Sequence, residues 1–335
     1  MKTLLKYAQV ALVVLAIAAL LAAPLVLKPY GIFVLSQWAV MAIAAVGLNL
    51  TLGYAGQISL AQASFVGIGA YTVALLQPFG VPFALAFVAA GLLSFAIGWV
   101  LGYPALRVQH HYLAFVTLAF TTLVFLVMRN EEWLTGGIYG ISNIKRPIIL
   151  GWSTVKPVPF YYFALGMLAL VTAIVWWLLR SPWGRAFTAL RENPIRALSL
   201  GIDTRRYTLF AFAFGSALGG LSGAMHAPLV QFIEPTSFGL SLSLTLLLMV
   251  IVGGSGYFLG PFVGALVAVI MPEWPRFADG LYLIAYALLV LLLMTFCPSG
   301  ILGLFGRLAN LIETRAASAR RQSLSAKLDQ KPVSS

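Results

Sequence analysis

The feature that most limits the fold of this chain is a series of ten apolar stretches that contain no Asp, Glu, Lys or Arg. A helix rises 1.5 Å per residue, so about 20 residues cross a hydrocarbon core of about 30 Å. Most of the stretches have about this length. They predict membrane-spanning helices at residues 8–27, 32–52, 58–76, 83–103, 111–128, 160–179, 207–225, 238–253, 259–272 and 280–297.

The composition predicts an all-α integral membrane protein, a polytopic bundle of about eight to ten transmembrane helices. The chain is 61% hydrophobic and 9% charged, whereas soluble domains are about a quarter charged. The first stretch is longer than the roughly 7–15 apolar residues of a cleaved signal peptide, which favours a retained helix. The ninth stretch is short and begins with Gly260 and Pro261, so we expect it to be tilted, broken or only partly spanning.

The distribution of basic residues predicts the orientation. With the N-terminus inside, the inner segments hold 15 of the 21 Lys and Arg residues and the outer segments hold six. Because cytoplasmic loops are enriched in Lys and Arg, both termini are expected in the cytoplasm. The loop 180–206 is then cytoplasmic and the loop 129–159 faces outward. The basic tail 307–335 is expected to lie in the cytoplasm near anionic lipid headgroups.

What the spans lack limits the energy source. Proton-coupled carriers usually need an intramembrane carboxylate, and none of the spans contains one. Sodium coupling through carbonyl and hydroxyl oxygens remains open. No GxxxxGK[ST] phosphate-binding loop is present, and the glycine cluster 253–256 is followed by Tyr257. If ATP drives this protein, another polypeptide must bind it, and this chain needs a surface on which that polypeptide docks.

The residues give no support for a disulfide, a metal site, catalysis or nucleic-acid binding. The single cysteine, Cys297, excludes an internal disulfide and a cysteine metal cluster. No residues are arranged as a catalytic set, and no metal or cofactor is expected on this chain. We attribute the net charge of +12 to the basic residues that set the orientation of a membrane protein, and we expect no nucleic-acid partner.

The charged loop 180–206 is the candidate docking surface. Strong helix formers predict a short helix at 184–192. Asn193 and Pro194 then break it and start a second helix at 195–200, because Asn caps helices and Pro suits the first turn. Gly201 supplies the left-handed residue that ends it. From periodicity alone the loop is either a docking element or a solvated basic loop that only sets topology.

Four motifs resemble the membrane subunits of bacterial ABC importers for branched-chain amino acids. Together they cover most of residues 32–306. They are GLNLTLGYAGQISLAQASFVGIGAY (47–71), TGGIYGISNIKRP (135–147), FIEPTSFGLSLSLTLLLMVIVGGSGYFLGPFVGAL (232–266) and FCPSGILGLFG (296–306).

The resemblance implies that residues 1–306 form a permease domain and that the loop 180–206 couples it to an ATPase. Its partners would be a second homologous permease, two ABC ATPases and a periplasmic or lipid-anchored binding protein in the bacterial inner membrane. The implied substrates are leucine, isoleucine and valine. Urea, short-chain amides or another amino acid stay open within the family. An ion-coupled secondary carrier acting alone is the alternative from a different class.

Such permeases carry a coupling helix with the pattern EAA, three residues, then Gly. Aligning that glycine with Gly201 puts Ile195, Arg196 and Ala197 at the EAA positions, where only the last alanine fits. The residues expected to carry ATPase coupling are Arg191, Glu192, Asn193, Pro194, Arg196, Ala197 and Gly201.

Two glycine clusters at the cytoplasmic ends of their helices are the candidate translocation path. Glycines allow an unwound turn, and non-helical backbone at membrane depth is tolerated only where it is buried or lines a cavity. For Gly67 and Gly69 the alternatives are tight helix packing and path lining. The residues expected to line the path are Gly53, Gly56, Gln57, Ser59, Gln62, Ser64, Gly254 and Gly256.

Overall fold

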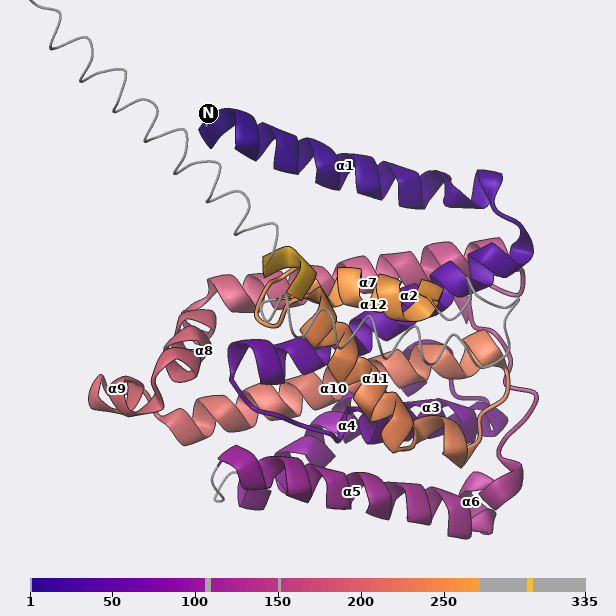
Figure 1. The fold of residues 1–335 in the computed structure, drawn as a ribbon. Coiled ribbons are helices and arrows are strands. Elements are labelled where there is room, and N and C mark those ends of the chain that lie inside the picture. Colours follow the sequence, from indigo (N-terminus) through magenta and orange to yellow (C-terminus); the bar gives the residue numbers. More distant parts are fainter. Residues whose placement is uncertain (1, 106–109, 150–151, 272–299, 304–335) are drawn as a thin grey trace, which may run out of the picture.

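The computed structural model describes residues 2–105, 110–149, 152–271 and 300–303. The described chain is a bundle of roughly parallel and antiparallel helices (Figure 1). The expected span 280–297 and the basic tail 307–335 lie outside the described residues. The long helices are α1 (Lys2–Val26), α2 (Pro29–Asn49), α3 (Gln62–Leu76), α4 (Phe83–Ala105), α5 (His110–Asn130), α7 (Pro157–Arg180), α8 (Pro182–Glu192), α10 (Thr204–Val230), α11 (Leu240–Gly253) and α12 (Gly260–Ile270).

Short elements connect these helices. They are η1 (Leu50–Tyr54), η2 (Gln77–Phe79), α6 (Glu132–Thr135), η3 (Gly137–Tyr139), β1 (Ile148–Ile149), β2 (Trp152–Ser153), α9 (Pro194–Ser199) and η4 (Pro235–Phe238). Within the described residues, strand structure occurs as the antiparallel hairpin β1–β2 and as one isolated bridge between Ile141 and Ile233. The predicted all-α class is confirmed.

Six helical segments of the described chain are long and apolar enough to cross a membrane. They are Pro29–Tyr54, Phe83–Ala105, Leu113–Asn130, Pro157–Arg180, Thr204–Val230 and Pro235–Gly253. Two apolar helical segments are shorter than these six. They are Val14–Val26 of α1 and the 11-residue helix α12. The predicted helix at 58–76 was wrong at its start, because α3 begins at Gln62 and has 15 residues.

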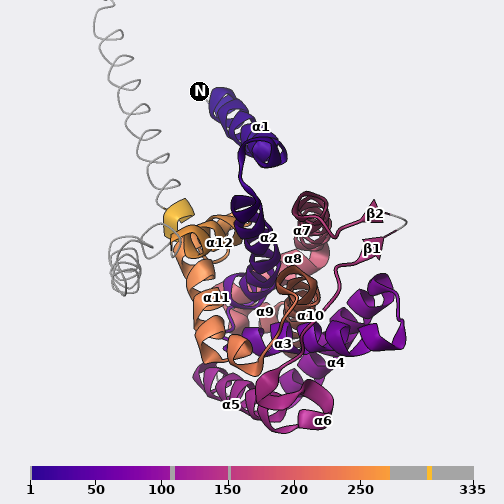
Figure 2. The same ribbon diagram turned by 90° about the vertical axis from the view of Figure 1, so that its right-hand side faces the viewer.

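Helices α2 and α10 form the centre of the bundle. In each of them 72% of the spanning window is buried, compared with 28% in α4, α5 and α7. Figure 2 looks along the bundle and shows α2 and α10 surrounded by the other helices. The centre is rich in Ala, Gly and Ser. Such small residues let helix backbones approach each other closely in a membrane.

The contact between α3 and α10 is made by backbone. A Cβ atom at Gly69 would collide with the carbonyl of Gly220, and one at Gly223 would collide with the carbonyl of Val66. Gly67 faces the Cβ of Phe238, 3.0 Å from where its own Cβ would be. Of the two alternatives for Gly67 and Gly69, the structure therefore supports tight packing.

The two predicted loops lie at opposite ends of the bundle (Figure 1). One end carries α8 and α9, and the other carries α6 and the hairpin β1–β2. At this second end the guanidinium of Arg146 donates to the carbonyl of Val155 over 2.8 Å, and burial lowers the pKa of Arg146. The two loops therefore lie on opposite sides of the bundle, as the expected topology requires, and the assignment of the loop 180–206 to the cytoplasm stays a prediction.

Candidate translocation path and coupling site

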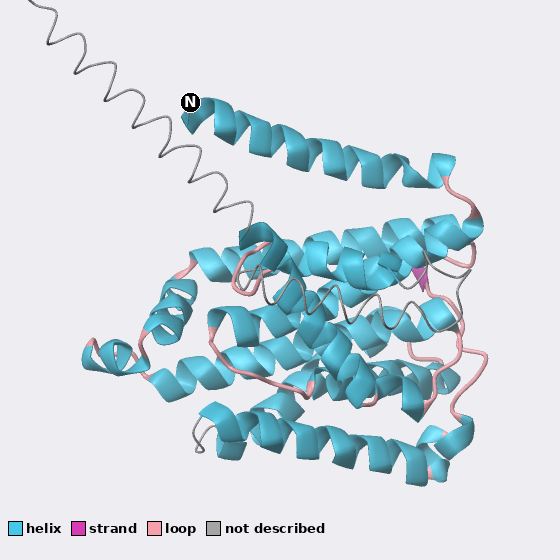
Figure 3. Cartoon of the chain, in the orientation of Figure 1, coloured by secondary structure: helices cyan, strands magenta, loops and turns pink. Residues whose placement is uncertain are grey.

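The first part of the site is a break between α2 and α3. The helix widens into the π-turn η1, and residues 56–61 are not helical. Figure 3 draws this segment as a long loop among the helices. Gly56 has a φ of 70°, a conformation that favours glycine. Residues 58–61 carry no charge, no proline and no glycine, so composition alone would let the helix continue through them; the break therefore depends on contacts with distant parts of the chain.

Hydroxyl groups from two other helices satisfy the backbone of this break. The Leu60 N–H donates to Thr117 Oγ1 over 3.0 Å, and the Leu60 carbonyl accepts from Thr121 Oγ1 over 2.8 Å. Ser243 of α11 also donates to the Leu60 carbonyl, and it accepts from the Ala63 N–H over 3.2 Å. The segment therefore meets the rule for non-helical backbone at membrane depth, which must find partners inside the protein.

Sequence analysis missed Thr117, Thr121 and Ser243. Their signal was the presence of hydroxyls inside otherwise apolar helices, with Thr117 and Thr121 one turn apart on the same face of α5. Such hydroxyls usually bond to their own helix, and both threonines also do so. Only the tertiary structure reveals that they have a second partner.

We expect Thr121→Ala to lower the free energy of unfolding by about 0.5–1.5 kcal/mol, because it removes one of the two hydroxyl donors to the Leu60 carbonyl, and Ser243 remains. The neighbouring Thr122 is exposed and donates only within its helix, to the Leu118 carbonyl. Thr122→Ala is the matched control, expected to change stability by less than about 0.5 kcal/mol. Thermal unfolding of the detergent-purified protein measures both, and equal losses in the two variants would contradict the assigned role.

The predicted polar path residues fall into two groups. The Gln62 amide donates to the carbonyls of Ala44 and Gly215, at 3.0 and 3.1 Å, so it ties α3 to α2 and α10. Ser59 Oγ accepts from the Ala61 N–H. In contrast, both side-chain polar atoms of Gln57 and the hydroxyl of Ser64 are buried without a hydrogen-bond partner among the described residues. Unpaired buried polar groups of this kind are rare and need an explanation.

The second part of the site is the turn between α11 and α12. Gly254 and Gly256 have φ values of 115° and 81°. The Asn49 side chain binds this turn twice: its Oδ1 accepts from the Gly256 N–H over 2.9 Å, and its Nδ2 donates to the Tyr257 carbonyl over 3.0 Å. Asn49, which sequence analysis did not single out, thus joins the two predicted glycine clusters.

The third part is the pair of helices α8 and α9. Both predicted helices are present: α8 ends at Glu192 as predicted but begins two residues earlier, at Pro182, and α9 begins and ends one residue earlier than predicted, at Pro194 and Ser199. Asn193 caps α9 by accepting from the Arg196 N–H over 3.0 Å, and Pro194 occupies its first turn. Gly201 has a φ of 81°. Ala197, predicted as a coupling residue, is only 1% exposed and packs inward.

The exposed surface of α9 and of the residue after it includes three large apolar side chains. Ile195 is 77% exposed, Leu198 61% and Leu200 79%. We call these three residues the apolar tip. Sequence analysis predicted a docking element here but did not include the three tip residues among the coupling residues. A six-residue helix is too short for periodicity to identify its buried side.

Arg191 brings the third part into contact with the second. Its Nη2 lies 3.5 Å from the Ser255 carbonyl, and a Cβ atom at Gly256 would collide with its guanidinium. The Cβ position of Gly56 lies 3.8 Å from the Cα of Arg191. The structure therefore collects Gly53, Gly56, Gly256 and Arg191 at the end of the bundle that carries α8 and α9.

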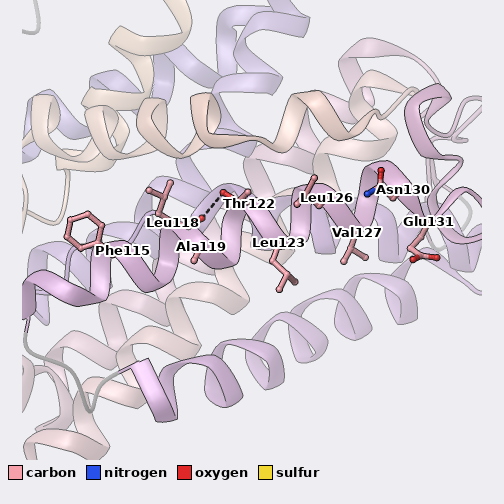
Figure 4. Close-up of a pocket in the computed structure, with 9 residues that line it drawn as sticks. All are labelled: Phe115, Leu118, Ala119, Thr122, Leu123, Leu126, Val127, Asn130 and Glu131. Atoms are coloured by element: carbon pink, nitrogen blue, oxygen red, sulfur yellow. Dashed lines mark hydrogen bonds between the residues drawn. The ribbon is translucent and has the colours of Figure 1, made fainter.

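A shallow groove on α5 lies away from this site (Figure 4). It is on the exposed face of the helix, opposite Thr117 and Thr121, and it opens to the protein surface. Nine residues line it: Phe115, Leu118, Ala119, Thr122, Leu123, Leu126, Val127, Asn130 and Glu131. Most of them are apolar, which suits a surface facing lipid or another membrane protein, and we do not assign the groove to the path.

Comparison with known proteins identifies the family. Residues 30–297 match the profile described as "Branched-chain amino acid transport system / permease component". The chain belongs to this permease family. It is 34% identical over 284 residues to the high-affinity branched-chain amino acid transport system permease protein LivM of Escherichia coli K12, covering 78% of this chain and 67% of the relative.

Two more distant relatives of this permease differ in the substrate for which they are named: one is named for branched-chain amino acids and the other for ribose. The probable branched-chain amino acid transport permease LivM of Methanocaldococcus jannaschii is 27% identical over 266 residues, 68% of this chain and 76% of that protein. The ribose import permease RbsC of Haemophilus influenzae is 26% identical over 243 residues, 70% of this chain and 73% of that protein. No solved structure matches the chain.

Family membership fixes the general role of the molecule. The chain is a multi-pass membrane protein and a transporter subunit, and it is one component of a larger transport system. The matched region of the permease contains both glycine turns, α8 and α9. Helix α1 precedes that region.

Proposed function

We infer that this permease forms half of an ATP-driven import path for branched-chain amino acids across the cytoplasmic membrane. The observation that carries the inference is the short helix pair α8–α9, which exposes an apolar tip at one end of the bundle and contacts both helix breaks at its other side. A docking element of this kind is needed by a chain that has no nucleotide-binding motif of its own. The names of the relatives in Escherichia coli and Methanocaldococcus jannaschii support branched-chain amino acids as cargo.

The partners follow from this role. A second homologous permease supplies the other half of the path. One ABC ATPase binds the loop 180–206 of this chain, and a second ABC ATPase binds the corresponding loop of the other permease. A periplasmic or lipid-anchored binding protein captures and selects the substrate. The permease itself binds no cofactor, because ATP hydrolysis takes place on the separate ATPase chains.

The path residues we propose are those at the two helix breaks. Gln57 and Ser64 have buried polar atoms that find no partner in the part of the chain that the structure describes, so a passing substrate or its water would meet groups free to bond. An amide both donates and accepts, which suits the carboxylate and ammonium groups of an amino acid. Gly53, Gly56, Ser59, Gly254 and Gly256 shape the surrounding backbone, while Gln62 holds the helices together.

The coupling residues we propose lie on α8, α9 and the turn after them. Glu192, Pro194 and Arg196 are exposed and available to the ATPase, together with the apolar tip. Asn193 and Gly201 fix the shape of the element, since one caps α9 and the other ends it. Ala197 supports it from the buried side.

Reconstitution tests this function against the alternatives. The chain is purified with its second permease and ATPases, placed in liposomes, and supplied with radiolabelled leucine bound to the binding protein. We expect uptake that requires hydrolysable ATP and that a non-hydrolysable analogue does not support. Uptake by the purified chain alone, driven by a sodium or proton gradient, would establish a secondary carrier instead. ATP-driven uptake of urea or ribose in preference to leucine would reassign the substrate.

A further inference from the structure

The inference starts from the position of Arg191 at the last turn of α8. Its side chain does not extend toward the apolar tip but turns to the α11–α12 connection. Nη2 lies 3.5 Å from the Ser255 carbonyl, and the guanidinium fills the space that a side chain at position 256 would need. Gly256 also has a φ of 81°, so both the backbone and Arg191 require glycine there.

The turn that Arg191 contacts is itself bound to the first helix break. Asn49 joins them by its two hydrogen bonds to Gly256 and Tyr257. At Gly53, the space of the missing side chain is occupied by the Asn49 amide oxygen and the Gly256 nitrogen. The two helix breaks therefore form one packed unit, and Arg191 lies at its cytoplasmic surface.

One turn earlier on the same face, α8 is anchored to the same unit. Phe187 is fully buried and packs with Leu50 and Ala55, at and just after η1, and with Ala211 of α10. A rigid helix held by a buried aromatic side chain on one face and by Arg191 at its end cannot move without moving the segments it holds. Packed interfaces transmit such displacements because they do not deform continuously.

We propose that Arg191 is an internal transmission residue, which links movement of α8–α9 to both helix breaks, and that it is not a contact for the ATPase. This inference rests on the proposed function, in which ATPase closure displaces α8–α9. When α8 shifts, Arg191 pulls on the Ser255–Gly256 turn, and Asn49 carries the displacement to Gly53 and Gln57. The role differs from the sequence-based prediction for Arg191, which assigned it to docking.

The test separates transmission from docking. Arg191→Ala is compared with Arg185→Ala, a matched change of an exposed arginine on the same helix with no role in this site. In the reconstituted complex we expect Arg191→Ala to lower ATP-driven leucine uptake at least about tenfold, while the amount of ATPase bound stays within about twofold of wild type. Arg185→Ala is expected to keep both leucine uptake and ATPase binding at the wild-type level. Loss of ATPase binding with Arg191→Ala, or uptake within twofold of wild type, overturns the proposal.

A double variant checks that Arg191 acts through the glycine turn. Gly256→Ala is expected to reduce uptake by itself, because it collides with the guanidinium. If the two positions form one link, the variant with both changes loses no more uptake than the worse single variant, since contacting residues are not additive. A loss equal to the product of the single losses means independent roles and overturns the proposal.

Hydrogen exchange gives a readout that does not depend on transport. In the purified complex, Arg191→Ala is expected to speed amide exchange in residues 50–56 and 254–257 by about fivefold or more, because local opening becomes easier. Arg185→Ala leaves both segments unchanged. If wild type takes up no leucine but Arg191→Ala still loosens both segments, the proposed function fails and the link stands. Unchanged exchange in either segment overturns the link.

Discussion

The substitution Gly69→Val is expected to prevent the bundle from assembling into a stable fold. Gly69 lies where α3 crosses α10, and even a Cβ atom there would collide with the Gly220 carbonyl. Backbone cannot rotate away as a side chain can, so the two helices must separate. Separation would also disturb the reciprocal contact of Gly223 with the Val66 carbonyl. Overpacking in a core costs about 1–3 kcal/mol, and a forced separation of central helices belongs above that range.

The expected loss of about 3 kcal/mol or more is a large part of a total stability of about 5–15 kcal/mol. We expect Gly69→Val to give little monodisperse protein on size-exclusion chromatography after detergent extraction, with a greatly lowered midpoint of thermal unfolding. Gly166→Val is the matched control, because Gly166 is exposed on α7 and no atom lies within 4 Å of its Cβ position. Similar losses in both variants would show that the α3–α10 crossing is not special.

Local sequence signals predicted the docking element well. The limits of α8 and α9 follow from Asn193, Pro194 and Gly201, which act through their own caps, ring and backbone freedom. Features of this kind need no information from the rest of the chain. The same reasoning explains why the apolar runs identified the membrane helices, since hydrocarbon thickness fixes their length.

Features that depend on distant contacts were not accessible. Residues 58–61 carry no charge, no proline and no glycine, so composition extended the third helix through them. The bonds of Leu60 to Thr117, Thr121 and Ser243 explain why the helix starts later. The union of the two glycine clusters likewise depends on Asn49, some 200 residues away from Gly256 and Tyr257 in sequence. Hydrogen bonds of such long range leave no periodic pattern that sequence analysis can detect.

The apolar tip should carry most of the binding to the ATPase. Burying an apolar side chain contributes about 1.5–3 kcal/mol, whereas an exposed ion pair contributes about 0–1 kcal/mol. The three tip residues present apolar surface at the end of the bundle, and the neighbouring Arg196 can provide orientation. A solvated loop that only sets topology has no need of three exposed aliphatic residues on seven positions.

We therefore expect Ile195→Asp with Leu198→Asp to reduce ATPase co-purification at least about a hundredfold, because a carboxylate buried without a partner is strongly unfavourable. Leucine uptake should fall with it. The fold should survive, since exposed positions change stability by about 0.5 kcal/mol. Ile138→Asp is the matched control: Ile138 is 62% exposed, like Leu198 at 61%, but belongs to η3, which directly follows α6 at the other end of the bundle. It should leave ATPase binding intact. Full ATPase binding by the tip variant would return the loop 180–206 to the role of a topology signal and would require another docking surface.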